Sequence, residues 1–212
     1  MDEMGVKAVK YERDLEAVLG EIMGRWDVPG LAVGVVEGGE TVYAKALGVQ
    51  SLESRAPVTL DSVFSVQSVS KCFVATATLK LVERGILELD VPLVRYLPYF
   101  HMADERHLQI TVRQVLSHTS GMPDIDESSY VEWMARSEVD DGAAERFVRG
   151  LTDKRLVANP GERFSYSNIA YNVLGDLLAK VSNASFERVM QEQVLEPSGM
   201  TNSTFLLAAV PH

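Results

Sequence analysis

The sequence contains little of several features that mark particular protein classes. One cysteine, Cys72, stands in 212 residues, so no disulfide can form within the chain and the cysteine content indicates no redox compartment. Only 20 Lys and Arg stand against 30 Asp and Glu, which gives a formal net charge of −10. Nucleic-acid phosphates bind to clustered positive charge, so no nucleic-acid partner is predicted. No apolar run approaches the roughly 20 residues that cross a bilayer, so no membrane span is predicted.

Targeting and metal-binding patterns are also missing. The first 26 residues lack the apolar segment of a signal peptide, which favours a cytoplasmic location. A mature exported protein would look the same after removal of its signal, so the compartment stays unknown. The histidines His101, His107 and His212 show no metal-ligand spacing with one another or with Cys72. Neither a metal nor another cofactor is predicted.

What is present is the composition of an ordinary globular protein, with 46% hydrophobic and 24% charged residues. The length allows one large domain or two lobes. Two short stretches around Gly38-Gly39, ending near Gly48, predict a β-hairpin. Its first strand is apolar on both faces, so helices are expected to cover it. Apolar spacing and helix-end signals predict helices over residues 9–26, 68–84 (stopped by Gly85), 142–153, 168–182 and 184–195, with a further short helix capped by Thr111 and Gln114.

The stretch "SVSKCFVATATLK" places Ser68 and Lys71 three residues apart at a predicted helix start. This spacing puts both side chains on one face of the helix. Burial and the positive end of the helix would both disfavour the ammonium form of a lysine there, and neutral lysine can accept the proton of a serine hydroxyl. Alternatively, Ser68 is only a helix cap and Lys71 a surface residue. Cys72 is either a reactive thiol or, as is usual for free cysteine, a small buried residue, which is the expectation.

A second group, "YSN", lies about 98 residues further along and before an apolar helix. A tyrosine beside a cation can act as an acid or a base. Asn168 offers two donors and an acceptor, so it can join Lys71, Tyr166 and a substrate carbonyl. The alternative interpretation is structural, with Tyr166 packed in the core and Asn168 capping the next helix.

Five stretches stand together in one order. They are "VPGLAVGVV", "FSVQSVSKCF", "ITVRQVLSHTSGMPD", "PGERFSYSNIAYNVLGDLL" and "VLEPSGMTNSTF". In order and spacing they resemble the serine β-lactamase and penicillin-binding-protein superfamily. The Tyr-x-Asn element is similar to that of class C β-lactamases, family VIII carboxylesterases, and the related DD-peptidases and D-aminopeptidases. The resemblance covers residues from about 28 to 205.

The resemblance implies roles for individual residues. Ser68 would be the acylated nucleophile, and Lys71 would activate or orient it. Tyr166 would accept and later return the proton, and Asn168 would contact the lysine and the substrate. The backbone N–H of Ser68 would form one half of an oxyanion hole. His118 lies in the family landmark "SHTSG" and is expected to be structural rather than a catalytic base.

The sequence departs from the family pattern in two respects. Gln67 stands where relatives often have a small residue, so it is expected to line the substrate entrance beside Ser68. The family's third motif, Lys or His followed by Thr or Ser and then Gly, does not follow Asn168. Because the chain stops at His212, we expect it to be the first part of a longer protein, without the C-terminal strands. Such a chain is expected to be a poor catalyst by itself.

The sequence therefore predicts an α/β, β-lactamase-like, two-lobed fold with an antiparallel sheet and a helical lobe inserted after the first hairpin. Residues 1–65 would form the helix and hairpin of the α/β lobe, residues 66–205 a mainly helical lobe with both motifs, and residues 206–212 a truncated end. Ser68 would lie in a cleft between the lobes. The predicted function is serine hydrolysis of an ester, a D-amino-acid peptide or a β-lactam. The predicted partner is a small-molecule or short-peptide substrate. The alternative is a non-catalytic member that binds peptides or cell-wall fragments, or a fragment that needs a second chain. Self-association through an exposed sheet edge is also expected.

Overall fold

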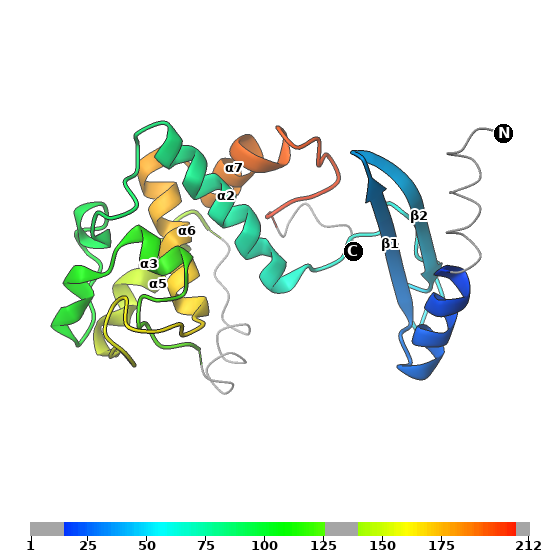
Figure 1. The fold of residues 1–212 in the computed structure, drawn as a ribbon, viewed down its shortest axis with the longest axis horizontal. Coiled ribbons are helices and arrows are strands. Elements are labelled where there is room, and N and C mark those ends of the chain that lie inside the picture. Colours follow the sequence, from blue (N-terminus) through cyan, green and yellow to red (C-terminus); the bar gives the residue numbers. More distant parts are fainter. Residues whose placement is uncertain (1–14, 126–139, 207–212) are drawn as a thin grey trace. The chain divides into compact units, whose positions relative to one another are not determined.

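The computed structural model describes residues 15–125 and 140–206. The chain divides into two compact units, residues 1–64 and residues 65–212. Figure 1 shows the hairpin β1–β2 in the first unit and helices α2, α3, α5, α6 and α7 in the second. The predicted helix over 9–26 is confirmed for residues 15–25, and residues 9–14 lie outside the described part. The predicted end over 206–212 also lies outside it, except for Leu206.

The first unit contains the predicted hairpin. Strand β1 (Gly30–Glu37) pairs antiparallel with β2 (Glu40–Gly48), and the register runs from Gly30 opposite Gly48 to Glu37 opposite Glu40. Gly38 and Gly39 both have positive φ, at 62° and 88°, as a tight two-residue hairpin turn requires. Within the described residues this sheet has two strands, so each strand keeps one edge without a strand partner. The self-association expected through such an edge stays a prediction.

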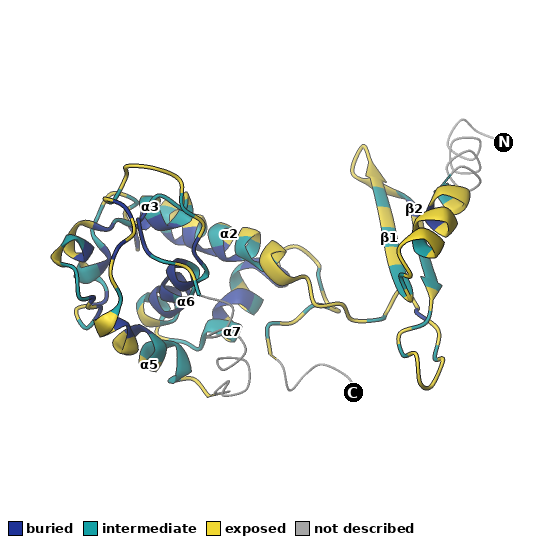
Figure 2. Ribbon diagram, turned by 90° about the horizontal axis from the view of Figure 1, so that it is seen from below, coloured by how far each residue is buried: buried dark blue, intermediate teal, exposed yellow. Residues whose placement is uncertain are grey.

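Strand β1 is less covered than its composition suggested. Its residues alternate between half-buried and exposed (Figure 2), and the exposed fraction of Val36 is 67%. Within the first unit the described residues cover β1 only in part, and the expectation that helices cover both of its faces stays a prediction. The alternation is that of a sheet packed on one face, since successive side chains point to opposite sides.

The second unit is helical and is built around one buried helix. Helix α6 (Asn168–Ser182) contacts α2 (Ser70–Glu83), α3 (Val112–Leu116), α5 (Ala143–Arg149) and α7 (Phe186–Met190). Helix α6 is largely buried (Figure 2), as expected for a helix that is covered on most sides. Eight of its 15 residues are buried. The remaining elements are short helical turns, η1 (Gln67–Val69), η2 (Leu93–Arg95), η3 (Glu105–Gln109), η4 (Gly150–Asp153) and the π-helical η5 (Gln191–Leu195).

Local signals act at two helix ends as the sequence predicted, but α2 begins at Ser70, after the turn η1, rather than at the predicted Ser68. Gly85, with φ +70°, donates its N–H to the carbonyl of Val82 and ends α2. Thr111 and Gln114 form the predicted capping box at α3, with each side chain bonded to the backbone of the other. These two signals set the end of α2 and the start of α3, and both helices contact α6.

Cys72 corrects a prediction, because its side chain is exposed rather than buried. The buried residues of α2 are Val74, Ala77, Thr78 and Leu81, which lie on one face at helical spacing. Cys72 precedes Val74 by two residues, and two helical steps turn it to about the opposite side. Small residues occur on several sides of this helix, so the sequence pattern did not indicate which face is buried.

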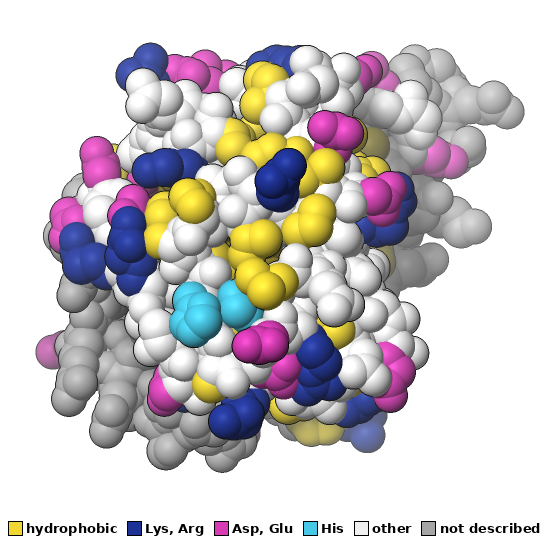
Figure 3. Space-filling view, turned by 90° about the vertical axis from the view of Figure 1, so that its left-hand side faces the viewer, with side chains coloured by type: hydrophobic (Ala, Val, Ile, Leu, Met, Phe, Trp, Pro, Cys, Tyr) yellow, Lys and Arg dark blue, Asp and Glu magenta, His cyan; other side chains and the backbone are white. Residues whose placement is uncertain are grey.

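The described residues contain neither a helix that could span a membrane nor a group of side chains placed to bind a metal ion. No described helix combines the length and apolar character needed to cross a bilayer. Among residues 15–125 and 140–206, no group of three His, Cys, Asp or Glu is placed to hold a metal ion. Figure 3 shows one face on which basic side chains are dispersed among acidic ones.

Candidate active site

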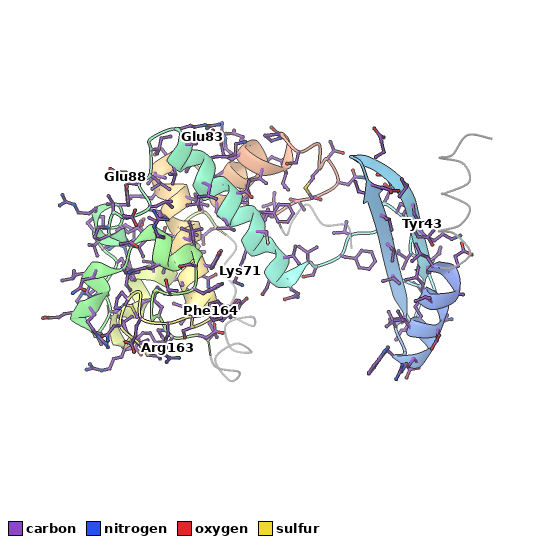
Figure 4. All side chains as sticks on the ribbon, in the orientation of Figure 1. Tyr43, Lys71, Glu83, Glu88, Arg163 and Phe164 are labelled. Carbon is purple, nitrogen blue, oxygen red and sulfur yellow. The ribbon has the colours of Figure 1, made fainter. Side chains whose placement is uncertain are left out.

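Four side chains from two distant parts of the second unit meet at the start of α2. Ser68 lies in the turn η1, Lys71 in the first turn of α2 (Figure 4), Tyr166 in the loop before α6, and Asn168 at the first position of α6. The hydroxyls of Ser68 and Tyr166 are 2.7 Å apart, although the two residues are 98 positions apart in the chain. Lys71 Nζ donates to Ser68 Oγ at 3.2 Å and to Asn168 Oδ1 at 2.7 Å.

The helix-cap interpretations of Ser68 and Asn168 are wrong. Ser68 is the middle residue of η1, the N-cap of α2 is Val69, and no side-chain cap bond is made there. At α6 the cap is Ser167, whose hydroxyl accepts the N–H of Ala170 at 3.0 Å. The side chains of Ser68 and Asn168 therefore do not cap helices; both accept hydrogen bonds from Lys71 Nζ.

Lys71 is half-buried and is surrounded by oxygen atoms and aromatic rings. Its Nζ lies 4.9 Å from the ring centroid of Tyr166 and 5.7 Å from that of Tyr171. Both distances fall within the range of cation–π attraction. The interpretation of Lys71 as a stray surface residue is wrong, since its ammonium group is held by Ser68, by Asn168 and by both rings.

Asp124 orients the amide of Asn168. Asp124 Oδ1 accepts the backbone N–H of Asn168 at 2.8 Å, and Oδ2 lies 3.4 Å from Asn168 Nδ2. The amide oxygen of Asn168 then faces the Lys71 ammonium. The reverse orientation would place NH₂ against NH₃⁺ and C=O against the carboxylate, so charge selects the observed one. The sequence analysis missed Asp124, because nothing in "GMPDID" indicates that it meets residue 168.

His118 lies directly against Tyr166. The ring centroids of the two residues are 4.5 Å apart with an interplanar angle of 31°, and Tyr171 stacks on His118 at 4.9 Å. The N–H of Ser167 donates to His118 Nδ1 at 3.2 Å. Burial lowers the pKa of His118 from 6.5, and the nearby charge of Lys71 lowers it further, against the opposing effect of Asp124.

Gln67 occupies a strained position but is not joined to the other four residues. Its φ is +46°, a region that residues other than Gly, Asn and Asp avoid and that is enriched at functional sites. Its side-chain amide donates to Ser65 Oγ at 3.1 Å. The role of Gln67 in binding substrate stays a prediction.

The candidate site is open to solvent in the second unit. Ser68 is exposed, Tyr166 is 38% exposed, and Phe164 beside His118 is 65% exposed. The expected cleft between two lobes stays a prediction, because each unit is described by itself. The oxyanion role of the Ser68 N–H likewise stays a prediction.

The helical unit, the hairpin and the Ser-x-x-Lys and Tyr-x-Asn cluster define a protein with the β-lactamase-like fold. The family model described as Beta-lactamase matches residues 15–211, so the chain belongs to the Beta-lactamase family. This family was the one expected from the motifs.

Individual relatives and solved structures agree with this assignment. Esterase EstB from Burkholderia gladioli is 30% identical over 211 residues, which cover 93% of this chain and 54% of EstB. Protein flp from Staphylococcus aureus is 25% identical over 92% of this chain and 38% of its own length. The structure of EstCE1, a hydrolase with promiscuous acyltransferase activity, matches with a TM-score of 0.77 and 26% identity, over 92% of this chain and 53% of EstCE1. An octameric penicillin-binding protein homologue from Pyrococcus abyssi matches with a TM-score of 0.72 and 32% identity, over 89% of this chain and 43% of the homologue.

The chain spans between 38% and 54% of the length of these curated relatives. What the relatives do as whole proteins is therefore a matter for proposal rather than assignment.

Proposed function

We propose that this chain carries the acylation site of a serine hydrolase that cleaves esters through an acyl-enzyme on Ser68. The observation that carries the proposal is the contact of Ser68 Oγ with both Tyr166 OH, at 2.7 Å, and Lys71 Nζ, at 3.2 Å. A serine hydroxyl becomes a nucleophile when a neighbouring group takes its proton as it attacks. Both candidate groups for that proton lie within hydrogen-bond reach.

The hydrogen bonds suggest the direction of proton transfer. Lys71 donates to Ser68 Oγ, so the serine proton is free to point toward the oxygen of Tyr166. As Ser68 Oγ forms a bond to the ester carbonyl carbon, its proton passes to the Tyr166–Lys71 pair, which must begin one proton short. When the tetrahedral intermediate collapses, the pair returns that proton to the leaving alkoxide oxygen. Water then attacks the acyl group by the same route and regenerates the Ser68 hydroxyl.

Asn168 supports this arrangement by holding Lys71. Its Oδ1 accepts from Lys71 Nζ at 2.7 Å, and the Tyr166 hydroxyl lies 3.4 Å from the same oxygen. One amide oxygen thus positions both members of the proton-accepting pair. A fixed geometry matters because misplacement of a reacting group by about 1 Å can cost on the order of 10² in rate.

An ester is the favoured substrate among the three classes that the motifs allow. EstB is named an esterase, and EstCE1 is described as a hydrolase with acyltransferase activity. Transfer of an acyl group to water or to another acceptor passes through the same serine ester. A D-amino-acid peptide and a β-lactam remain substrates to compare with esters in the assay.

The test is covalent labelling with a fluorophosphonate probe, followed by mass spectrometry of the labelled peptide. The adduct is expected on Ser68 and should be absent in Ser68→Ala. Ser70→Ala is the matched control, because Ser70 is two residues away as the first residue of α2, whereas the contact with Tyr166 is made by Ser68. Hydrolysis of p-nitrophenyl esters and of benzylpenicillin then compares the substrate classes. An adduct on another residue, or labelling that persists in Ser68→Ala, would reject the proposed nucleophile. Absence of any adduct would favour a non-catalytic binding protein or a fragment that needs a second chain.

A further inference from the structure

His118 holds the Tyr166 segment from both sides. Its backbone carbonyl accepts the N–H of Ser165 at 2.7 Å, and its ring Nδ1 accepts the N–H of Ser167 at 3.2 Å. The two residues that flank Tyr166 are thus bonded to one histidine. The imidazole also stacks on the Tyr166 ring, with the centroids 4.5 Å apart. The backbone and the ring of Tyr166 are therefore positioned by the same residue.

His118 makes these contacts to the Tyr166 segment from an unfavourable backbone conformation. His118 has φ +54°, in the left-handed region that only a few per cent of non-glycine residues adopt. Such conformations persist where surrounding contacts determine them, and they cluster at functional sites. Here the surrounding contacts are those to Ser165, Ser167 and Tyr166.

The bond from Ser167 also determines the protonation state that the contact needs. A nitrogen that accepts a hydrogen bond carries no proton, so the clamped imidazole is neutral with its hydrogen on Nε2. The charged and titratable groups that face it are Lys71 from α2, Asp124 from the following loop, and the phenols of Tyr166 and Tyr171. Protonation at Nδ1 would remove the acceptor of the Ser167 N–H and would add a positive charge near Lys71.

We propose that His118 is a positioning residue that holds Tyr166 in register with Ser68, and that it does so only as the neutral imidazole. The proposal rests on the proposed function, since it concerns the same proton-accepting pair. His118 does not touch the reacting atoms and acts through Tyr166. Acidification releases the Ser167 N–H, loosens the Tyr166 segment, and lowers the rate of acylation at Ser68.

Two substitutions separate the hydrogen bond from the stacking contact. His118→Asn keeps an acceptor oxygen near the position of Nδ1, tolerates the positive φ, and does not titrate. His118→Phe keeps an aromatic ring but has no acceptor. The matched control is His101→Gln, because His101 is an exposed histidine that contacts His107 and none of the site residues.

The rate of fluorophosphonate labelling is measured between about pH 5 and pH 8 for all four proteins. At the upper end, His118→Phe is expected to lower the labelling rate constant by about tenfold to a hundredfold, with the apparent binding constant of the probe little changed. His118→Asn is expected to lose less, and its labelling should fall less on acidification than that of the wild type and of His101→Gln. Equal rates in His118→Phe and wild type, or the same acid loss in His118→Asn and wild type, would overturn the proposal.

Nuclear magnetic resonance of the wild-type chain provides a test that needs neither labelling nor a foldable variant. Imidazole ¹⁵N shifts are expected to show an unprotonated Nδ1 at neutral pH. The Tyr166 ring resonances should shift with the same midpoint as the His118 titration. If the wild type takes no label, the proposed function fails, and this titration still decides the role of His118. A protonated Nδ1 at neutral pH, or Tyr166 resonances that do not follow His118, would reject the clamp even in a protein that labels normally.

Discussion

Removing the hydroxyl of Tyr166 separates the activity of the site from the stability of the fold. Tyr166→Phe deletes one oxygen, 2.7 Å from Ser68 Oγ, and keeps the ring that stacks on His118 and lies under Lys71. A hydrogen bond contributes about 0.5–1.5 kcal/mol to stability, and this solvent-open one should be at the low end. A positioned acid or base contributes about 10²–10⁴ in rate, which is roughly 2.7–5.4 kcal/mol of barrier. The labelling rate should therefore fall steeply while the melting temperature changes little.

Lys71→Ala tests whether the lysine and the tyrosine act as one unit. Both groups contact Ser68 Oγ, and both contact the same oxygen of Asn168. If they share one proton, either substitution alone removes most of the effect. The double variant should then label about as slowly as the slower single variant, rather than at the product of the two losses.

The assay is the second-order rate constant for fluorophosphonate labelling, accompanied by thermal unfolding of each variant. Tyr171→Phe is the control, because its hydroxyl donates to the carbonyl of Leu116 and not to Ser68. It should cost a structural hydrogen bond and change labelling by less than about threefold. Multiplicative losses in the double variant, or a fall of less than about tenfold for Tyr166→Phe, would refute the shared-proton argument.

Three further outcomes follow from particular contacts. Asp124→Ala should slow labelling by about tenfold or more and add little once Asn168 is already alanine, because Asp124 acts through the amide that it orients; additive losses would contradict this. Gly121→Ala should lower the free energy of unfolding by about 2–5 kcal/mol in denaturant titrations, since φ is +73° and a Cβ would stand 2.3 Å from the carbonyl oxygen of Ala158; a change near zero would show that the loop moves freely. Burial raises the pKa of Asp176 above 3.8 in the folded state. The contribution of Asp176 to the free energy of unfolding is therefore most favourable at low pH, and it is lost as the pH rises through the raised pKa. Asp176→Asn should be more stable than wild type by about 1 kcal/mol at neutral pH, with a gap that closes toward about pH 4; a gap that does not depend on pH would exclude this cause.

Local chemistry made much of the fold predictable. The Gly38-Gly39 turn, the capping box of Thr111 and Gln114, and the stop at Gly85 each depend on residues within a few positions of one another. Signals of this kind can be recognised in a sequence because the backbone preference and the partner lie in the same short segment. The meeting of Ser68 and Lys71 is equally local, because Ser68 lies in the turn η1 directly before α2 and Lys71 in the first turn of α2.

The sequence by itself determined which elements form, where most of the helices end, and that Ser68 and Lys71 share a face. Only the tertiary structure decided which residues meet them. The loop before the buried helix α6 brings Tyr166 to a serine 98 positions away, and α6 itself brings Asn168 to Lys71, 97 positions away. The loop with His118 and Asp124 also meets the start of α6, although no spacing rule links those residues to 166 or 168. The exposed side of Cys72 was settled in the same way, because packing of α2 against α6 selects one face of a helix whose residues are small on several sides.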